Sequence, residues 1–535
     1  MFEMSGRNID CLFIGSNYMK LEETEKLMRL ADSGSYREFN FEFVQHNQKL
    51  YSLAELYNNF RYGSNDITVG SIFSATIAYL ANYLHNRGLT FDYVNSFREE
   101  REELIDMLKT CNIQTIAIPT TLYVTLQPIL EIVSFVRKYN NTAKIVIGGP
   151  FIFNLLIEDN EAEEQANLFD RINGDFYIYS AQGEKALVNL INRIKSKSNS
   201  FEDIENLFYK QGTKYIKTAN VPENNSLEDN MVDWTLFSSK MKESILVRTS
   251  ISCPFSCSYC EYPIRNGKYR TASVAAVERE LNSIAQIDKI KNVYFIDDTL
   301  NFPPQRFKDI LRMMIKNKYK FKWGSFFRCQ FADREMIELM KESGCIMLFL
   351  GIESGNQMIL DRMNKNATLD VFRKGLQLIN EFEIPSTASF VIGFPGETEE
   401  TINETIQFIE ETKPTFYAMN LWYFSKFSAI ANQRDKYDLK GSEYGWSHHT
   451  MDCKTAVGLM EKMLLTIKNS IHLPKYNFDN TGILNLFNQG MSIEQVKNLV
   501  SAFNNGIEQK LLDTNNVEFS RSLIDRMISQ FPEPI

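Results

Sequence analysis

The chain has 535 residues, and 44% of them are apolar, which is enough for several hydrophobic cores in about two to four domains. Its net charge of −9, from 58 basic and 67 acidic residues, argues against nucleic acid as a partner, because phosphate binding needs concentrated lysine and arginine. The sequence shows no secretory signal and no run of about 18 apolar residues, so we expect a cytoplasmic protein with no membrane span.

Strand and helix patterns alternate over residues 1–200, which predicts an open, doubly wound parallel sheet. Buried strands are expected at 9–15, 113–121 and 143–150. Residues 18–68 are too many for an ordinary connection and are expected to form an insertion. The polar, weakly periodic residues 201–242 are expected to form a linker.

Six further β–α units are expected over residues 243–430, two short of a closed eight-stranded barrel. The expected strands lie at 244–250, 292–296, 322–327, 346–350, 386–392 and 417–424. This pattern predicts a partial, TIM-like (β/α)6 barrel, whose functional residues should lie at the carboxyl ends of the strands. Residues 431–535 are expected to form a mainly helical domain, with helices such as 454–471 and 493–512.

Three of the eight cysteines, Cys253, Cys257 and Cys260, directly follow the first expected barrel strand. Clustered thiolates suit iron–sulfur clusters and zinc. A structural zinc ion normally takes four ligands, whereas the local set stops at three and histidine is absent from residues 86–447. Three thiolates would leave one iron of a [4Fe–4S] cluster open to a substrate or cofactor. A zinc or redox-active cysteine site is the alternative.

The pattern C-x₃-C-x-aromatic-C after a first barrel strand, with Tyr259 as the aromatic residue, resembles the radical SAM superfamily. This resemblance implies that Cys253, Cys257 and Cys260 hold a [4Fe–4S] cluster. It further implies that the open iron chelates S-adenosyl-L-methionine, which one electron cleaves to a 5′-deoxyadenosyl radical.

The same resemblance implies roles for residues at the ends of later barrel strands. Asp297 and Asp298 correspond to an acidic pair of the cobalamin-linked branch, although helix capping explains them equally well. Glu353 and Ser354 match positions that contact the ribose or the methionine part of the nucleoside. Gly393 lies in VIGFPGET, which resembles an adenine-contact segment, and a tight turn is the alternative.

The segments IPTTLYVT, IVIGGPF and SAQGEKAL resemble the cobalamin-binding domain that precedes the barrel in B12-dependent radical SAM enzymes. The implied cobalamin contacts are Thr120, Thr121, Gly148 and Gly149. None of the five histidines has aspartate two residues before it, so the histidine cobalt ligand of methionine-synthase-type domains is not expected. The lower axial ligand of cobalt therefore stays open.

A closer resemblance, to the group of the phosphinothricin-pathway P-methyltransferase, is carried by DCLFIGSNYM (10–19), GSYREFNFEFV (34–44) and GWSHHTMD (445–452). It implies that His448 and His449 contact substrate or close the site, and a plain surface pair is the alternative.

Together these resemblances imply a B12-dependent radical SAM methyltransferase. It would methylate an unactivated carbon or a phosphinate phosphorus of a small metabolite through methylcobalamin and the 5′-deoxyadenosyl radical, with a reductant such as flavodoxin or ferredoxin. The enzymatic alternative is a cobalamin radical SAM enzyme that catalyses a non-methylating rearrangement. The non-enzymatic alternative is an iron–sulfur or zinc module that senses redox state or binds a partner. Substrate and oligomeric state stay open.

Overall fold

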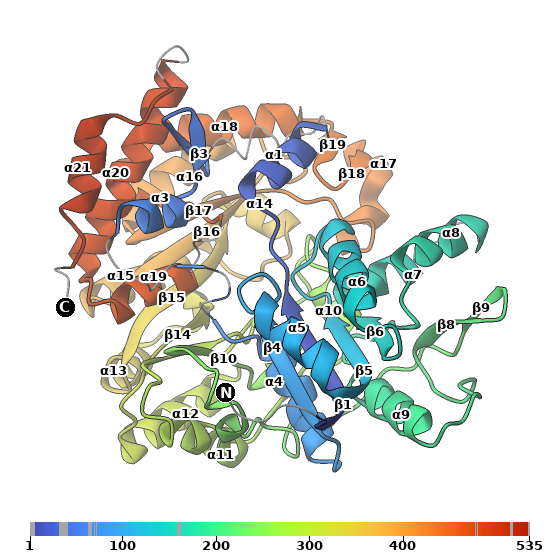
Figure 1. The fold of residues 1–535 in the computed structure, drawn as a ribbon. Coiled ribbons are helices and arrows are strands. Elements are labelled where there is room, and N and C mark those ends of the chain that lie inside the picture. The colour runs from blue at the N-terminus through green and yellow to red at the C-terminus, as the bar shows by residue number, and fades with distance from the viewer. Residues whose placement is uncertain are drawn as a thin grey trace. The chain divides into compact units, whose positions relative to one another are not determined.

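The computed structural model describes residues 6–30, 41–61, 67–68, 70, 72–157, 162–476, 478, 480–513 and 517–532 (Figure 1). The chain divides into two compact units. The first unit comprises Met1–Met19, Phe73–Met241 and Arg279–Gln286, and the second comprises Lys20–Ile72, Lys242–Glu278 and Ile287–Ile535. Within these described ranges, no helix combines the length and the apolar character that crossing a membrane requires.

The first unit is built on a seven-stranded sheet in the order β4-β1-β5-β6-β7-β8-β9. Its first five members pair in parallel and are β4 (Phe91–Ser96), β1 (Asn8–Ser16), β5 (Asn112–Pro119), β6 (Lys144–Gly148) and β7 (Phe176–Ile178). The helices between and after them are α4 (Ala75–His85), α5 (Arg101–Thr110), α6 (Gln127–Tyr139), α7 (Pro150–Ile157), α8 (Ala162–Ile172) and α9 (Glu184–Lys195). Strands such as β1 are apolar and buried almost throughout, as parallel strands covered on both faces must be.

The expected linker at 201–242 differs from the structure, because part of it completes the first sheet. The strands β8 (Leu207–Gln211) and β9 (Lys214–Lys217) form an antiparallel hairpin, and β8 pairs antiparallel with β7. The rings of Phe208 and Tyr215 stack with their centroids 4.9 Å apart and hold the hairpin together. Because these short strands end in exposed polar residues, the sequence shows no clear strand pattern there.

The expected insertion after β1 belongs to the second unit rather than to the first sheet. It contains α1 (Leu21–Leu30), β2 (Val44–His46), β3 (Lys49–Tyr51) and α3 (Leu53–Phe60), and its residues 31–40, 62–66, 69 and 71 lie outside the described residues. Tyr57 donates a hydrogen bond to Gln489 (2.6 Å), and the ring of Phe43 lies 4.8 Å from that of Tyr476. The insertion therefore packs on the C-terminal part of the chain.

The second unit contains a parallel sheet in the order β10-β13-β14-β15-β16-β17-β21. The six expected barrel strands are β10 (Ser244–Val247), β13 (Asn292–Phe295), β14 (Lys322–Phe327), β15 (Cys345–Glu353), β16 (Ser386–Ile392) and β17 (Phe416–Leu421). A seventh strand, β21 (Ile471–His472), pairs with β17 and was not expected. The longer helices that follow the barrel strands are α11 (Val274–Ala285), α12 (Pro304–Asn317), α13 (Arg334–Glu342), α15 (Leu369–Glu381), α16 (Glu399–Thr412) and α18 (Cys453–Thr466).

Ring contacts show which side chains of the barrel strands face the helices. Phe390 of β16 lies 6.4 Å from Phe408 of α16, so its neighbour Ser389 points to the barrel interior. Phe327 of β14 lies 6.3 Å from Phe307 of α12, so Phe326 points inward as well.

The last part of the chain is mainly helical, as expected, with α19 (Asn480–Asn488), α20 (Ile493–Leu512) and α21 (Arg521–Ile528). It begins, however, with a small antiparallel sheet of β18 (Lys440–Ser442), β19 (Gly445–His448) and β20 (Met451–Asp452). This sheet carries the histidine pair. The remaining short elements are β11 (Ser250–Ile251), α10 (Tyr262–Asn266), β12 (Arg270–Thr271), α14 (Gln357–Arg362), α17 (Arg434–Tyr437) and the 3₁₀ turns at 234–237, 329–331 and 429–433.

Candidate functional site

The three clustered cysteines lie in the loop between β11 and α10, directly after the first barrel strand. Cys257 is buried, and Cys253 and Cys260 are half-buried. Burial, together with the negative charges that Cys257, Asp298 and Cys253 can carry, raises the pKa of Cys260 to about 12. The three thiols therefore lie close enough to influence one another.

The three thiols form a candidate ligand set for an iron–sulfur cluster. Among the described residues, no three or more His, Cys, Asp or Glu side chains are placed to hold a single metal ion. The fit to a cluster therefore rests on donor chemistry: three thiols in one loop supply the soft ligands that iron–sulfur clusters take. Cys253 Sγ also lies 3.2 Å from the hydroxyl of the buried Thr299. The residues present fit a cluster held by three cysteines.

The cysteine loop is held by hydrogen bonds from two other segments of the barrel. The backbone N–H of Ser258 donates to the carbonyl of Met363 (2.8 Å), and the amide of Asn364 donates to the carbonyl of Ser256 (2.8 Å). On the other side, Ile430 donates to the carbonyl of Ser258 (2.9 Å). Because backbone groups on both flanks are paired, the loop geometry is fixed by the fold.

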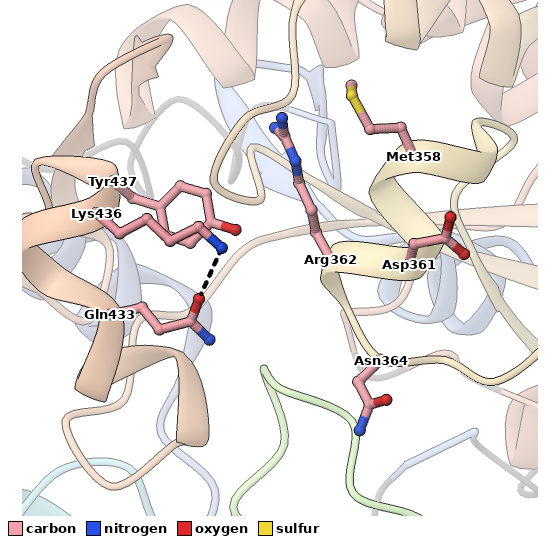
Figure 2. Close-up of a pocket in the computed structure, with 7 residues that line it drawn as sticks. All are labelled: Met358, Asp361, Arg362, Asn364, Gln433, Lys436 and Tyr437. Atoms are coloured by element: carbon pink, nitrogen blue, oxygen red, sulfur yellow. Dashed lines mark hydrogen bonds between the residues drawn. The ribbon is translucent and has the colours of Figure 1, made fainter.

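A cavity of about 570 Å³ borders this loop (Figure 2). Figure 2 shows Arg362 of α14 reaching toward the side of the cavity formed by α17, while Asp361 points away from it. Lys436 donates to Gln433 across 3.3 Å at the α17 side. The complete lining is Met358, Asp361, Arg362, Asn364, Gln433, Lys436 and Tyr437. Since Asn364 also bonds the cysteine loop, the cavity and the loop share a wall.

Glu353 ends β15 in a strained position and forms a buried ion pair. Its φ is +75°, at a register shift between β15 and β16, and its carboxylate accepts a hydrogen bond from Lys365 Nζ at 2.9 Å. The side chains of Glu353 and Lys365 are 11% and 4% exposed. Burial and the charge of Glu353, to which the hydroxyl donates, hold the pKa of Tyr259 far above its usual range. Glu353 thus connects the cysteine loop to the ion pair.

Arg328 and Ser354 complete this region. The Arg328 guanidinium lies 3.7 Å above the ring of Phe255 in the cysteine loop, and it donates to the carbonyl of Lys365 at 2.7 Å. Ser354 is buried, and its hydroxyl accepts a hydrogen bond from the backbone N–H of Asn356 (3.2 Å). Neither Arg328 nor Lys365 was expected from the sequence, because single cations twelve or more residues from a motif carry no local signal.

The two expected aspartates differ in their surroundings. Asp297 is buried and accepts hydrogen bonds from the backbone N–H of Thr249 (3.0 Å) and the hydroxyl of Ser250, so it ties the turn after β10 to the end of β13. Burial raises its pKa. Asp298 is exposed to solvent, but the protein around its carboxyl group removes part of its hydration and raises its pKa to about 6. Asp298 is thus the member of the pair that is exposed to solvent, and the Tyr262 hydroxyl donates a hydrogen bond to its carboxylate.

Gly393 lies under an aromatic wall at the end of β16. Its φ is +90°, and a methyl group at this position would come within 2.4 Å of the Trp446 ring. The N–H of Gly393 donates to the buried Glu397 (2.6 Å), and His448 Nε2–H donates to its carbonyl (3.0 Å). Trp446 and His448 stack 5.2 Å apart. These contacts fix the conformation of the turn. His448, one of the two expected histidines, is buried against the turn rather than lying on the surface.

Burial shifts the pKa values of both Glu397 and His448 at this turn. The pKa of Glu397 is raised to about 8, and no described residue forms a hydrogen bond with its Oε1. The pKa of His448 is lowered to about 4. His449 bonds instead to the carbonyl of Tyr437 through Nδ1 (3.1 Å). Glu397 was missed from the sequence because a glutamate before a helix looks like an ordinary first-turn residue.

In the first unit, the expected cobalamin contacts lie together at the carboxyl ends of β5 and β6. The Thr120 hydroxyl donates to the carbonyl of Gly148 at 2.9 Å, and a methyl group at Gly149, whose φ is +113°, would lie 2.9 Å from that hydroxyl. Thr121 is exposed and hydrogen-bonded to Thr76 (3.0 Å).

The loop that follows these residues exposes two large apolar side chains, since Leu122 is 62% exposed and Val124 is 87% exposed. Ligands of parallel sheets bind at this edge. Exposed apolar surface at this edge of the sheet fits a large, flat cofactor such as a corrin ring.

Comparison with known proteins gives the family of the barrel. Residues 247–409 match the radical SAM superfamily, whose members use a [4Fe–4S] cluster and S-adenosyl-L-methionine. Among curated proteins, the anaerobic magnesium-protoporphyrin IX monomethyl ester cyclase of Cereibacter sphaeroides is 25% identical over 409 residues, which cover 71% of this chain and 64% of the cyclase. The chain therefore spans less than two thirds of the length of this relative.

Among solved structures, the cobalamin-dependent S-adenosylmethionine radical enzyme OxsB, with aqua-cobalamin and S-adenosylmethionine bound, is similar at a TM-score of 0.59 and 14% identity, over 98% of this chain and 78% of that chain. The radical S-adenosylmethionine methyltransferase TsrM from Kitasatospora setae is similar at a TM-score of 0.56 and 15% identity, over 69% of this chain and 74% of that one. These likenesses confirm the expected fold class.

Proposed function

Because residues 247–409 are a radical SAM domain, in a chain with the fold of cobalamin-dependent radical SAM enzymes, we propose that this protein is a B12-dependent radical SAM methyltransferase acting on a small molecule. The observation that carries the proposal is the single loop that brings three thiols together beside Tyr259 and Glu353. When bound, the cluster with S-adenosyl-L-methionine would supply a 5′-deoxyadenosyl radical, and cobalamin would supply the methyl group.

The residues of the barrel divide the work of binding. Cys253, Cys257 and Cys260 hold the cluster, and the hydrogen bonds to their loop keep the thiols in register. Glu353 is fixed by Lys365, so its second oxygen keeps one direction toward a bound nucleoside. A fixed ligand geometry is what radical chemistry needs, because the protein must align the reacting atoms and exclude water.

The remaining contacts complete the two cofactor sites. The locked turn at Gly393 would shape the end of β16 beside an adenine, and Asp298 and Ser354 would border the nucleoside. Thr120, Thr121, Gly148 and Gly149 would bind cobalamin, and the exposed side chains of Leu122 and Val124 would offer apolar contact to it. Reduction would come from a low-potential protein of the cytoplasm, such as flavodoxin or ferredoxin. An unactivated carbon or a phosphinate phosphorus is the proposed methyl acceptor, on the resemblance to the P-methyltransferase group; residues 34–40 of that resemblance lie outside the described residues.

A second candidate is a cobalamin radical SAM enzyme that rearranges or closes a ring without methylation. It is favoured by the 25% identity to a curated cyclase over 71% of this chain. The two candidates differ in product mass, since only methylation adds a CH₂ unit to the substrate.

The test is anaerobic reconstitution with iron, sulfide and hydroxocobalamin, followed by reduction in the presence of S-adenosyl-L-methionine. We expect 5′-deoxyadenosine, which Cys257→Ala abolishes and the matched buried control Cys345→Ala retains. Cobalamin content should be similar in both variants, because Thr120 and its neighbours lie in the other unit. Absence of 5′-deoxyadenosine from a sample with full iron and cobalamin content would reject the proposal.

A further inference from the structure

Lys475 places an ammonium group at the carboxyl ends of the last barrel strands. It follows β21, which pairs with β17 through Tyr417 and His472, so Lys475 lies beside Asn420. Its Nζ donates to Asn420 Oδ1 at 2.7 Å. Within the part of the chain that the structure describes, no carboxylate forms an ion pair with this ammonium. The cation is half-buried, and the acceptor that the described residues offer it is a neutral amide oxygen.

The position of Asn420 is itself fixed. Its amide nitrogen donates to the hydroxyl of Ser389 (2.8 Å) and to the carbonyl of Phe390 (3.2 Å). With the nitrogen committed to these acceptors, the amide oxygen must face Lys475. Because Ser389 points to the barrel interior, the chain of Ser389, Asn420 and Lys475 runs along the inner wall.

The backbone of Lys475 is anchored independently of its side chain. The carboxylate of Glu42, from the insertion, accepts hydrogen bonds from the backbone N–H groups of Lys475 (2.5 Å) and Tyr476 (3.0 Å). The Phe43 ring packs on Tyr476. The insertion thus holds the ammonium at the barrel wall, and the fold would keep this position if the side chain were changed.

The inner wall is aromatic on β14 and β15, which lie further along the same sheet from β17. Phe326 of β14 and Phe349 of β15 are half-buried and lie 5.3 Å apart in an edge-to-face arrangement. Glu353 on β15 pairs with Phe390, and Asn420 on β17 pairs with Val391, so both lie at nearly the same height. Two strand spacings separate them, which is about 10 Å.

We propose that Lys475 binds an oxyanion of the substrate, a carboxylate, phosphate or phosphinate group, while Phe326 and Phe349 contact its apolar part. Half-burial of a cation without a counter-ion is unfavourable, and a charge-assisted hydrogen bond to an anion offsets that cost. Because Asn420 lies about 10 Å from Glu353 across the sheet, an anion bound beside Asn420 would leave about one small-molecule length for the reacting atom. This inference rests on the proposed function, because it names the substrate class for the same site.

The test measures anion binding by titration calorimetry on the anaerobic, reconstituted holoenzyme, with benzoate, phenylphosphinate and phenyl phosphate as probes and neutral benzamide as the comparison. We expect an oxyanion to bind more tightly than benzamide, and Lys475→Met to weaken it about 10- to 100-fold. Lys475→Arg should keep most of the affinity. Lys320→Met, which removes an exposed lysine just before the start of β14, should change nothing.

Asn420→Asp provides a test that leaves the lysine in place. The new carboxylate would pair with Lys475 and compete with the probe, so we expect a loss similar to that of Lys475→Met. Equal binding of anions to wild type, Lys475→Met and Asn420→Asp would overturn the inference, as would equal binding of benzamide and benzoate.

Failure of the inference and failure of the proposed function are distinguishable in the same samples. Wild-type enzyme that forms 5′-deoxyadenosine but shows no Lys475-dependent anion binding contradicts the inference alone. Lys475-dependent binding in a holoenzyme that forms no 5′-deoxyadenosine supports an anion site and contradicts the proposed function.

Discussion

Removal of the Lys365 ammonium should destabilise the second unit strongly, because it leaves Glu353 as an uncompensated buried charge. The two side chains are 4% and 11% exposed and are joined at 2.9 Å. Removing one partner of such a pair costs about 3–5 kcal/mol, whereas removing both charges together costs far less. We therefore expect Lys365→Met to lower the free energy of unfolding by about 3–5 kcal/mol, and Lys365→Met/Glu353→Gln to recover more than half of that loss. In the double variant, the Tyr259 hydroxyl can still donate to the new amide oxygen.

The assay is urea unfolding of the cofactor-free protein, followed by tryptophan fluorescence. Trp323, Trp422 and Trp446 belong to the second unit and Trp234 to the first, so the signal reports mainly on the unit that holds the pair. The exposed control Lys320→Met should stay within about 0.5 kcal/mol of wild type. A loss below about 1 kcal/mol for Lys365→Met, or a double variant no more stable than the single one, would refute the reasoning.

Three further predictions concern the Gly393 turn and the first unit. Glu397 has a folded pKa of about 8 against an ordinary value of 4.5, so its contribution to stability is full below pH 4.5 and is lost as the pH rises toward 8. Glu397→Gln should therefore raise the free energy of unfolding at pH 8.5 by an amount of the order of 3 kcal/mol, with a smaller gain at pH 6. Thermal unfolding at the two pH values measures this, and equal gains would contradict it. Gly393→Ala should lower the free energy of unfolding by at least about 2 kcal/mol, because of the positive φ and the contact with Trp446. The control Gly490→Ala, with a similar φ but open space around it, should lower it by only about 1–2 kcal/mol in the same urea assay. Equal losses would argue against the Trp446 contact. Leu122→Asp should weaken hydroxocobalamin binding, measured by corrin absorbance after desalting, without changing the unfolding temperature, and unchanged retention would remove the apolar loop from the cobalamin site.

The barrel was predictable because short strand runs alternate regularly with helical patterns along the chain. Runs such as IMLFL and SFVI are mainly apolar and too short for helices, and the six expected strand positions matched the structure. The two-residue strand β21 was missed because it is too short for any periodicity. The hairpin β8–β9 was missed because its strands end in exposed polar residues.

The candidate site was predictable only where the chemistry lies in one short stretch. The cysteine loop carries three thiols in eight residues, and the sequence located it. Lys365, Glu397 and Lys475 depend instead on partners that the fold brings near them. The expected pair of aspartates shows the same limit, since only the structure reveals that Asp297 is buried and accepts hydrogen bonds from Thr249, whereas Asp298 is exposed to solvent.

The central claim is that three thiolates hold an iron–sulfur cluster whose remaining iron binds S-adenosyl-L-methionine. Electron paramagnetic resonance of the anaerobic, dithionite-reduced protein tests it most directly, with and without the nucleotide. The account predicts iron and sulfide matching one [4Fe–4S] cluster per chain, and a spectrum that changes when S-adenosyl-L-methionine is added. A site filled by zinc, or a cluster spectrum that the nucleotide leaves unaltered, would contradict it.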